Sequence, residues 1–148
     1  MNSARTQLLA LIGWPVEHSR SPAIHGAALR ALGIDAAYLA FAVQEEQLGA
    51  AIAGLRAIGA RGINVTIPHK RAVIDHLDAI DADARTIGAV NTFVRDGERL
   101  VGANTDATGL VRALQDAGCD PAGSSALVLG SGGAARAAVV GLMAAGAS

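Results

Sequence analysis

Residues 90–102 consist of two strand-like runs separated by Asp96-Gly97: Val90-Asn91-Thr92-Phe93-Val94-Arg95-Asp96-Gly97-Glu98-Arg99-Leu100-Val101-Gly102. Asp-Gly between two such runs is typical of a two-residue β-hairpin, which joins antiparallel strands. Upstream of the hairpin, apolar runs at residues 8–13, 38–43 and 62–67 predict strands that alternate with helical segments. Because that alternation favours parallel strands, we predict an α/β fold with a mixed, mostly parallel sheet flanked by helices.

The segments between these strands carry helix signals. Ser21-Pro22 predicts a helix with Ser21 at its N-cap, and Gly33 predicts where that helix ends. Residues 45–58 are amphipathic, and two shorter helices are predicted at residues 70–77 and 82–87.

A second unit is predicted to follow the hairpin. We expect a helix at residues 108–117, a strand at 126–129 and a helix at 133–145. Residues 1–103 then form one α/β domain, and residues 104–148 hold the first βα unit of a Rossmann-like domain. Since a parallel sheet needs further strands beyond that unit, we expect the chain to be a fragment.

Composition excludes several classes of function. The 148 residues carry 12 Lys and Arg against 13 Asp and Glu, so no basic field is available for nucleic acid or an anionic membrane. No apolar run approaches the roughly 18 residues of a membrane span. The single cysteine, Cys119, excludes an intrachain disulfide and suits the cytoplasm. The histidines lack metal-ligand spacing, so no metal is expected.

A glycine-rich turn lies between the last predicted strand and the last predicted helix: Gly130-Ser131-Gly132-Gly133-Ala134-Ala135. It fits G-x-G-x-x-G/A, in which glycines let a pyrophosphate approach the backbone at a helix N-terminus. The alternative is a tight turn that binds nothing. The residue that reads the ribose lies about 20 positions further on, so these residues do not distinguish NAD from NADP.

Polar residues gather where the predicted strands end. Asn64 and Thr66 are two apart on one strand and share a face, and Lys70, the only lysine in the chain, follows them. Lysine gives up a proton where arginine does not, so Lys70 suits proton transfer, although chance in an arginine-biased composition is the alternative. Asp106 follows the hairpin, where it is either the partner of Lys70 or a plain N-cap.

Two hydroxyls, those of Ser19 and Ser21, stand at the start of the first helix and suit a carboxylate, with simple helix capping by Ser21 as the alternative. Asn91 adds an amide that faces the same place. Ligands of open α/β sheets gather at the carboxyl ends of strands, which is where these residues are expected.

Together these segments resemble the shikimate dehydrogenase family. The matching stretches cover the whole chain in the family's order: residues 12–15, 18–22, 62–70, 88–92, 104–106 and 130–135. The resemblance implies a reversible NADP(H)-dependent reduction of 3-dehydroshikimate to shikimate in aromatic amino-acid biosynthesis. The family usually runs to about twice this length, so the resemblance also implies a truncated form, whose isolated activity is open.

The resemblance assigns roles to single residues. Ser19 and Ser21 would hold the substrate carboxylate, and Thr66, Asn91 and Asp106 would hold ring hydroxyls, with Asn64 nearby. The catalytic pair would be Lys70 and Asp106, and the pyrophosphate would be lined by Gly130, Ser131, Gly132, Gly133 and Ala134.

Three points stay open at this stage. By the resemblance, a serine at position 21 favours shikimate over quinate, but a quinate/shikimate dehydrogenase of broader specificity is an alternative. A non-catalytic shikimate-binding fragment is another. A monomer and a homodimer are both compatible with the sequence.

Overall fold

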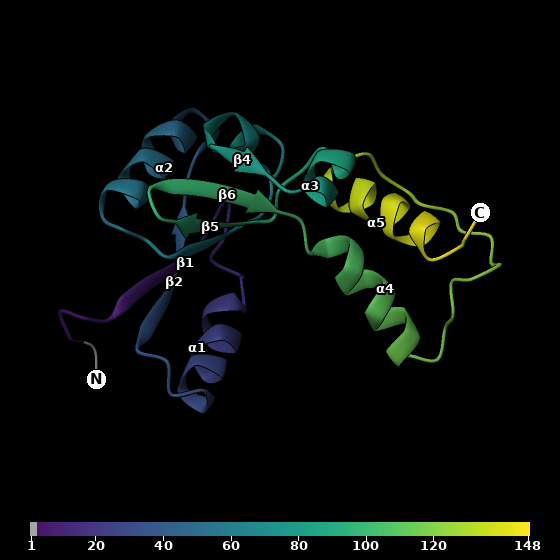
Figure 1. Ribbon diagram of the computed structural model, residues 1–148, viewed down its shortest axis with the longest axis horizontal. Helices are drawn as coiled ribbons and strands as arrows, with labels where there is room; N and C mark the ends of the chain where they lie inside the picture. The colour runs from purple at the N-terminus through teal and green to yellow at the C-terminus, as the bar shows by residue number, and fades with distance from the viewer. Residues whose placement is uncertain (1–2) are drawn as a thin grey trace.

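The computed structural model describes residues 3–148, which form a sheet with helices around it and a group of helices beside it (Figure 1). The elements in chain order are β1 (Gln7–Gly13), α1 (Ser21–Ala31), β2 (Ala36–Ala42), the 3₁₀ helix η1 (Glu45–Gln47), α2 (Leu48–Ala57), β3 (Gly62–Val65), the 3₁₀ helix η2 (Ala72–His76), β4 (Ala79–Ile80), α3 (Ala82–Ile87), β5 (Thr92–Asp96), β6 (Arg99–Ala103), α4 (Asp106–Asp116) and α5 (Gly133–Ala144).

The sheet is mixed, as the sequence predicts. Its strand order is β2-β1-β3-β5-β6-β4. The β1 strand pairs in parallel with β2 and β3, and β4 pairs in parallel with β6. The hairpin strands β5 and β6 are antiparallel, and Gly97 in the turn between them has a φ of 60°, which favours glycine. The predicted α/β class and the predicted hairpin are both confirmed.

The two faces of the sheet are covered by different helices (Figure 1). Ala10 and Ile12 of β1 pack into the larger cluster, which includes Ile52 and Leu55 of α2. Leu11 points to the other face and packs with Tyr38 and residues of α1. This alternation is the two-residue period of a strand, and full burial of an isoleucine-sized side chain stabilises the fold by about 2 kcal/mol.

Three predicted helix boundaries need correction. Ser21 is the first residue of α1, and Arg20 occupies the N-cap position. The Ser19 hydroxyl accepts a hydrogen bond from the Ser21 backbone N–H at 3.2 Å, and no side chain caps the helix from the N-cap position. The helix predicted at residues 70–77 is the short η2, and the one predicted at 45–58 is divided into η1 and α2.

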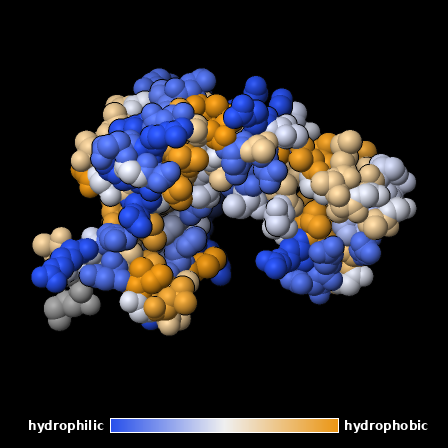
Figure 2. All heavy atoms as spheres, viewed as in Figure 1, coloured by the Kyte–Doolittle hydropathy of each residue, from blue (hydrophilic) through white to orange (hydrophobic). Residues whose placement is uncertain are grey.

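The helices that follow the hairpin pack on one another. A Cβ atom at Gly141 of α5 would come within 2.8 Å of the Ala107 backbone oxygen in α4, so the two helices approach closely there. Ala107 and Ala137 share a small apolar cluster with Ile87 and Ala89. Figure 2 shows an indentation between this group of helices and the part that contains the sheet.

The prediction of a strand at residues 126–129 is wrong. No strand is assigned there, and within residues 3–148 the segment joins no sheet. Leu127 and Leu129 are 85% and 87% exposed. An extended segment becomes a strand only when a neighbouring strand accepts and donates its backbone hydrogen bonds, and the described residues supply none here.

The described residues contain neither a helix that could span a membrane nor a cluster of side chains that could hold a metal ion. Over residues 3–148 no helix has the length and apolar character needed to cross a membrane. The same residues contain no group of three or more His, Cys, Asp or Glu side chains arranged to hold a metal ion.

Candidate active site

The centre of the candidate site is an ion pair between Lys70 and Asp106. Lys70 follows β3 and Asp106 begins α4, and Lys70 Nζ lies 2.5 Å from Asp106 Oδ2. The two side chains are 17% and 30% exposed, so the pair is partly shielded from water. Hydrogen bonds between ionised groups are shorter and stronger than neutral ones, so each group fixes the other's position.

Asn91 holds the second oxygen of the same carboxylate. Its amide Nδ2 donates to Asp106 Oδ1 at 2.7 Å and to Thr105 Oγ1 at 2.9 Å. Its Oδ1 accepts from the Thr105 backbone N–H at 3.0 Å, which fixes the orientation of the amide. Asp106 is therefore oriented through both oxygens, with the ammonium on one side and an amide on the other.

Asn104 holds the backbone of Asp106 in place, and the sequence alone assigned it no role. It is 4% exposed, donates from Nδ2 to the Ala89 backbone oxygen at 2.9 Å and accepts from the Asp106 backbone N–H at 2.9 Å. The N-cap position of α4 is Thr105 rather than Asp106, which frees the carboxylate for Lys70. The available signal was an asparagine two residues before an aspartate at a helix start, which is a common turn pattern.

On the α1 face, Tyr38 links the helix start to the central strand. Its hydroxyl donates to Asn64 Oδ1 at 2.7 Å, and Asn64 Nδ2 donates to Thr92 Oγ1 at 2.8 Å. Burial raises the pKa of the Tyr38 phenol, and the Ser21 side chain beside it acts in the opposite direction. A chain of hydrogen bonds thus runs from Tyr38 through Asn64 to Thr92, the neighbour of Asn91.

Tyr38 is the second residue whose part in the site the sequence did not indicate. Its ring stacks on His25 of α1, with centroids 4.2 Å apart and planes 3° from parallel. The signal was a hydroxyl within an otherwise apolar strand, which needs a polar partner once buried.

The remaining predicted residues are placed at the edges of this network. Thr66 follows β3, is half-buried and donates its backbone N–H to the Ile12 oxygen. Within the described part of the chain no side-chain partner is seen for the Thr66 hydroxyl. Asp106 is in direct contact with both Lys70 and Asn91, and Asn64 is hydrogen-bonded to Tyr38. Among the described residues, no hydrogen bond joins the hydroxyl of Ser19 or Thr66 to Lys70 or Asp106.

The glycine-rich turn has the features that a pyrophosphate requires. Gly130 has a φ of 132°, a conformation that favours glycine, and a Cβ at Gly132 would meet nothing within 4 Å. The backbone at Gly132 is therefore open to a ligand. The first N–H groups of α5 have no partner within the helix and offer donors and positive dipole character to an anion. The donor set and the space fit a dinucleotide.

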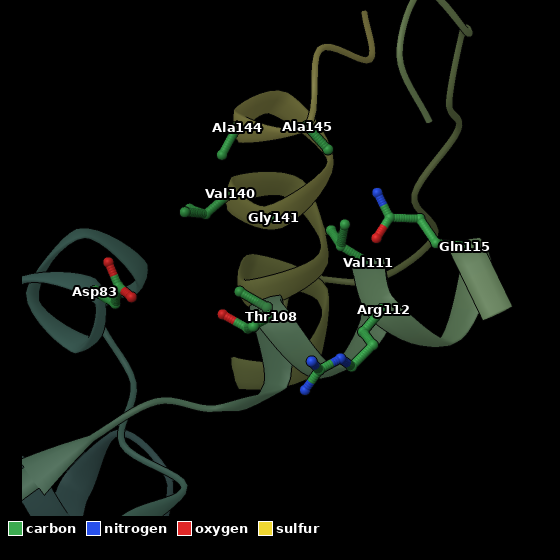
Figure 3. Close-up of a pocket in the computed structure, with 10 residues that line it drawn as sticks. Asp83, Thr108, Val111, Arg112, Gln115, Val140, Gly141, Ala144 and Ala145 are labelled. Atoms are coloured by element: carbon green, nitrogen blue, oxygen red, sulfur yellow. The ribbon is translucent and has the colours of Figure 1, made fainter. Parts of the chain in front are cut away.

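A separate hollow of about 500 Å³ lies among α3, α4 and α5 (Figure 3). Asp83 stands across it from Thr108 and Val140. None of the predicted site residues lines this hollow, so it is separate from the ion pair.

Comparison with known proteins identifies related sequences. The model for the shikimate dehydrogenase substrate-binding domain matches residues 11–93. Shikimate dehydrogenase (NADP(+)) of Geobacter metallireducens is 54% identical over 147 residues, which are 99% of this chain and 51% of that protein. The chain thus spans about half the length of the curated relatives it matches.

Solved structures give the same picture. The crystal structure of shikimate dehydrogenase from Aquifex aeolicus matches with a TM-score of 0.97 and 42% identity, over 100% of this chain and 56% of that one. Shikimate 5-dehydrogenase from Thermus thermophilus, crystallised with NADP(H) and shikimate, matches with a TM-score of 0.89 and 42% identity, over 95% and 53% of the two chains.

Proposed function

The chain belongs to the shikimate dehydrogenase family, and we propose that it supplies the substrate-binding and catalytic residues for the reversible NADP(H)-dependent reduction of 3-dehydroshikimate to shikimate, a step of aromatic amino-acid biosynthesis. The observation that carries this proposal is the Lys70–Asp106 ion pair, at 2.5 Å. The pair joins a group that can transfer a proton to a group that orients it.

Lys70 is the proton donor in this proposal. As the ketone is reduced, its ammonium gives a proton to the carbonyl oxygen, and the neutral amine takes the proton back when the alcohol is oxidised. Asp106 fixes the direction of the ammonium and accepts a hydrogen bond from a substrate hydroxyl. Asn91 keeps the carboxylate in place during both steps, because it binds the oxygen that Lys70 leaves free.

The other polar residues bind the substrate. Ser19 and Ser21 donate to the carboxylate at the start of α1, where the helix dipole also favours negative charge. Thr66, Asn64 and Asn91 contact ring hydroxyls. The link from His25 of α1 through Tyr38 to Asn64 supports this assignment, because it sets α1 relative to the central strand.

NADP(H) is proposed to bind at the glycine-rich turn, with its pyrophosphate against Gly130, Ser131, Gly132, Gly133 and Ala134. The bound nicotinamide supplies or accepts the hydride. In this arrangement residues 1–103 form the substrate domain, and residues 104–148 begin a Rossmann-like nucleotide domain. The open space at Gly132 and the free N–H groups of α5 support the assignment.

We also propose a cytoplasmic location, which suits the free thiol of Cys119, and action as a monomer or homodimer. Neither a nucleic acid nor a membrane is proposed as a partner, because the formal net charge is −1.

The direct test is to mix the protein with shikimate and NADP⁺ and to follow the absorbance of NADPH, with calorimetry to measure shikimate binding. We expect turnover with shikimate and little with quinate. Equal turnover with quinate supports the broader specificity instead. Shikimate binding without turnover, at saturating NADP⁺, supports a non-catalytic binding function and contradicts the enzymatic proposal for this chain.

A further inference from the structure

The first residue of α5, Gly133, lies directly against the side chain of Lys70. A Cβ atom at Gly133 would be 3.2 Å from both Cβ and Cδ of Lys70 and 3.2 Å from Cβ of Ala89. Carbon atoms that are not bonded to one another are most stable at about 3.5–4.0 Å, so all three contacts would be compressed. A methyl group at residue 133 would therefore require its neighbours, including the lysine stem, to shift by a few tenths of an ångström.

The neighbouring glycine shows that this contact is specific to one position. A Cβ at Gly132 would meet nothing within 4 Å, although the two residues are adjacent in the same turn. Gly130 differs again, because its φ of 132° is what requires glycine there. The three glycines of the turn thus meet different requirements: backbone conformation at Gly130, open space at Gly132 and contact with Lys70 at Gly133.

We propose that Gly133 is a positioning residue for Lys70. An added methyl group must displace Ala89 or Lys70. The backbones of both residues are held by hydrogen bonds. Ala89 is fully buried and its oxygen accepts a hydrogen bond from Asn104. The Lys70 backbone oxygen accepts from the Val90 N–H at 2.7 Å. The part free to move is the lysine stem, and its movement carries the ammonium away from Asp106.

The consequence for catalysis rests on the proposed function, whereas the effect on the ion pair does not. If Lys70 transfers the proton, the turn proposed to bind the pyrophosphate also sets the direction of the catalytic ammonium. Gly133→Ala is then expected to lower kcat on the order of tenfold, because small displacements of a reacting group are costly, with a smaller change in the KM for shikimate.

A spectroscopic test is available because Lys70 is the only lysine in the chain. Isotope-labelled lysine carries the label at this one residue, so its side-chain NMR signals need no assignment to a position in the chain. If the side chain of Lys70 is held in one orientation, we expect its two Hε protons to have distinct resonances. We expect Gly133→Ala to merge the two Hε resonances. The control Gly54→Ala, in α2 with nothing within 4 Å of the added Cβ, should leave them unchanged.

A second variant separates displacement of Lys70 from loss of the fold. Combining Gly133→Ala with Ala89→Gly removes the contact with Ala89 and keeps both contacts with Lys70, so this double variant should fold and still show merged resonances. Unchanged resonances in folded Gly133→Ala overturn the proposal, and so does a folded double variant that regains the two resonances, because the effect would then come from Ala89 and not from Lys70. Absence of turnover in the wild-type protein would instead contradict the proposed function and leave the NMR result standing.

Discussion

Two four-residue segments of this chain, β3 and residues 126–129, were both predicted as strands and have opposite surroundings. In β3, Ile63 and Val65 are 1% and 2% exposed, whereas Leu127 and Leu129 are 85% and 87% exposed. The difference lies in their neighbours. β3 is hydrogen-bonded between β1 and β5, whereas the described residues provide no strand beside 126–129.

The comparison shows that only one half of the candidate site depends on sheet pairing. Asn64 lies within β3, and Thr66 and Lys70 follow it, so pairing of this strand fixes the polar residues. The glycine-rich turn follows the unpaired segment and is held instead by α5, which packs on α4 and against Lys70. One half of the proposed site therefore depends on a sheet and the other on a single helix.

The largest expected effect is on stability. Ile63→Ala should lower the free energy of unfolding by about 3 kcal/mol, since it empties a buried position in the sheet. Leu127→Ala should change it by less than about 0.5 kcal/mol, because the leucine is exposed. Urea denaturation followed by circular dichroism measures both. Similar losses in the two variants would show that residues 126–129 are as firmly packed as β3.

The next effect is on activity. Lys70→Ala should lower kcat by about 10²-fold or more, because it removes the positioned proton donor, with a smaller change in KM. Arg71→Ala removes an exposed charge on the next residue and serves as the control. Steady-state rates of NADPH formation distinguish them. Near-normal turnover of Lys70→Ala would remove this lysine from the catalytic role.

A smaller effect is expected at the start of α1. Ser19→Ala should raise the KM for shikimate by about tenfold and leave kcat nearly unchanged, because a hydrogen bond to a carboxylate is lost in the ground and transition states alike. Ser125→Ala, before the unpaired segment, should change neither. An unaltered KM in Ser19→Ala would count against the carboxylate site.

The smallest effect concerns alkaline pH. Burial raises the pKa of Tyr38, so an unfolded chain, in which tyrosine titrates near 10, loses this proton before the folded chain does. Stability linked to Tyr38 is thus complete below pH about 10 and is lost as the pH rises further. Because the chain has one tyrosine, phenolate absorbance reports it alone. Tyr38→Phe should remove this part of the alkaline loss, and an identical pH dependence in both proteins would contradict it.

The sequence was sufficient for the elements whose signals are local. Alternation of strands and helices predicted the mixed sheet, and Asp96-Gly97 predicted the hairpin, because turn conformation depends on few residues. The meeting of Lys70 and Asp106 was predicted from their places after strands. The strand at 126–129 was predicted wrongly, because apolar composition does not show whether a neighbouring strand exists. Tyr38, Asn104 and the Gly133 contact depend on tertiary packing between distant segments.

The most direct test of the central claim is to titrate shikimate into the protein while observing the NMR signal of Lys70. If the ion pair forms the substrate site, the resonance shifts and saturates with shikimate in the wild-type protein, and the Asp106→Asn variant responds much more weakly. A Lys70 resonance that stays unchanged up to concentrations at which calorimetry shows bound shikimate would contradict it.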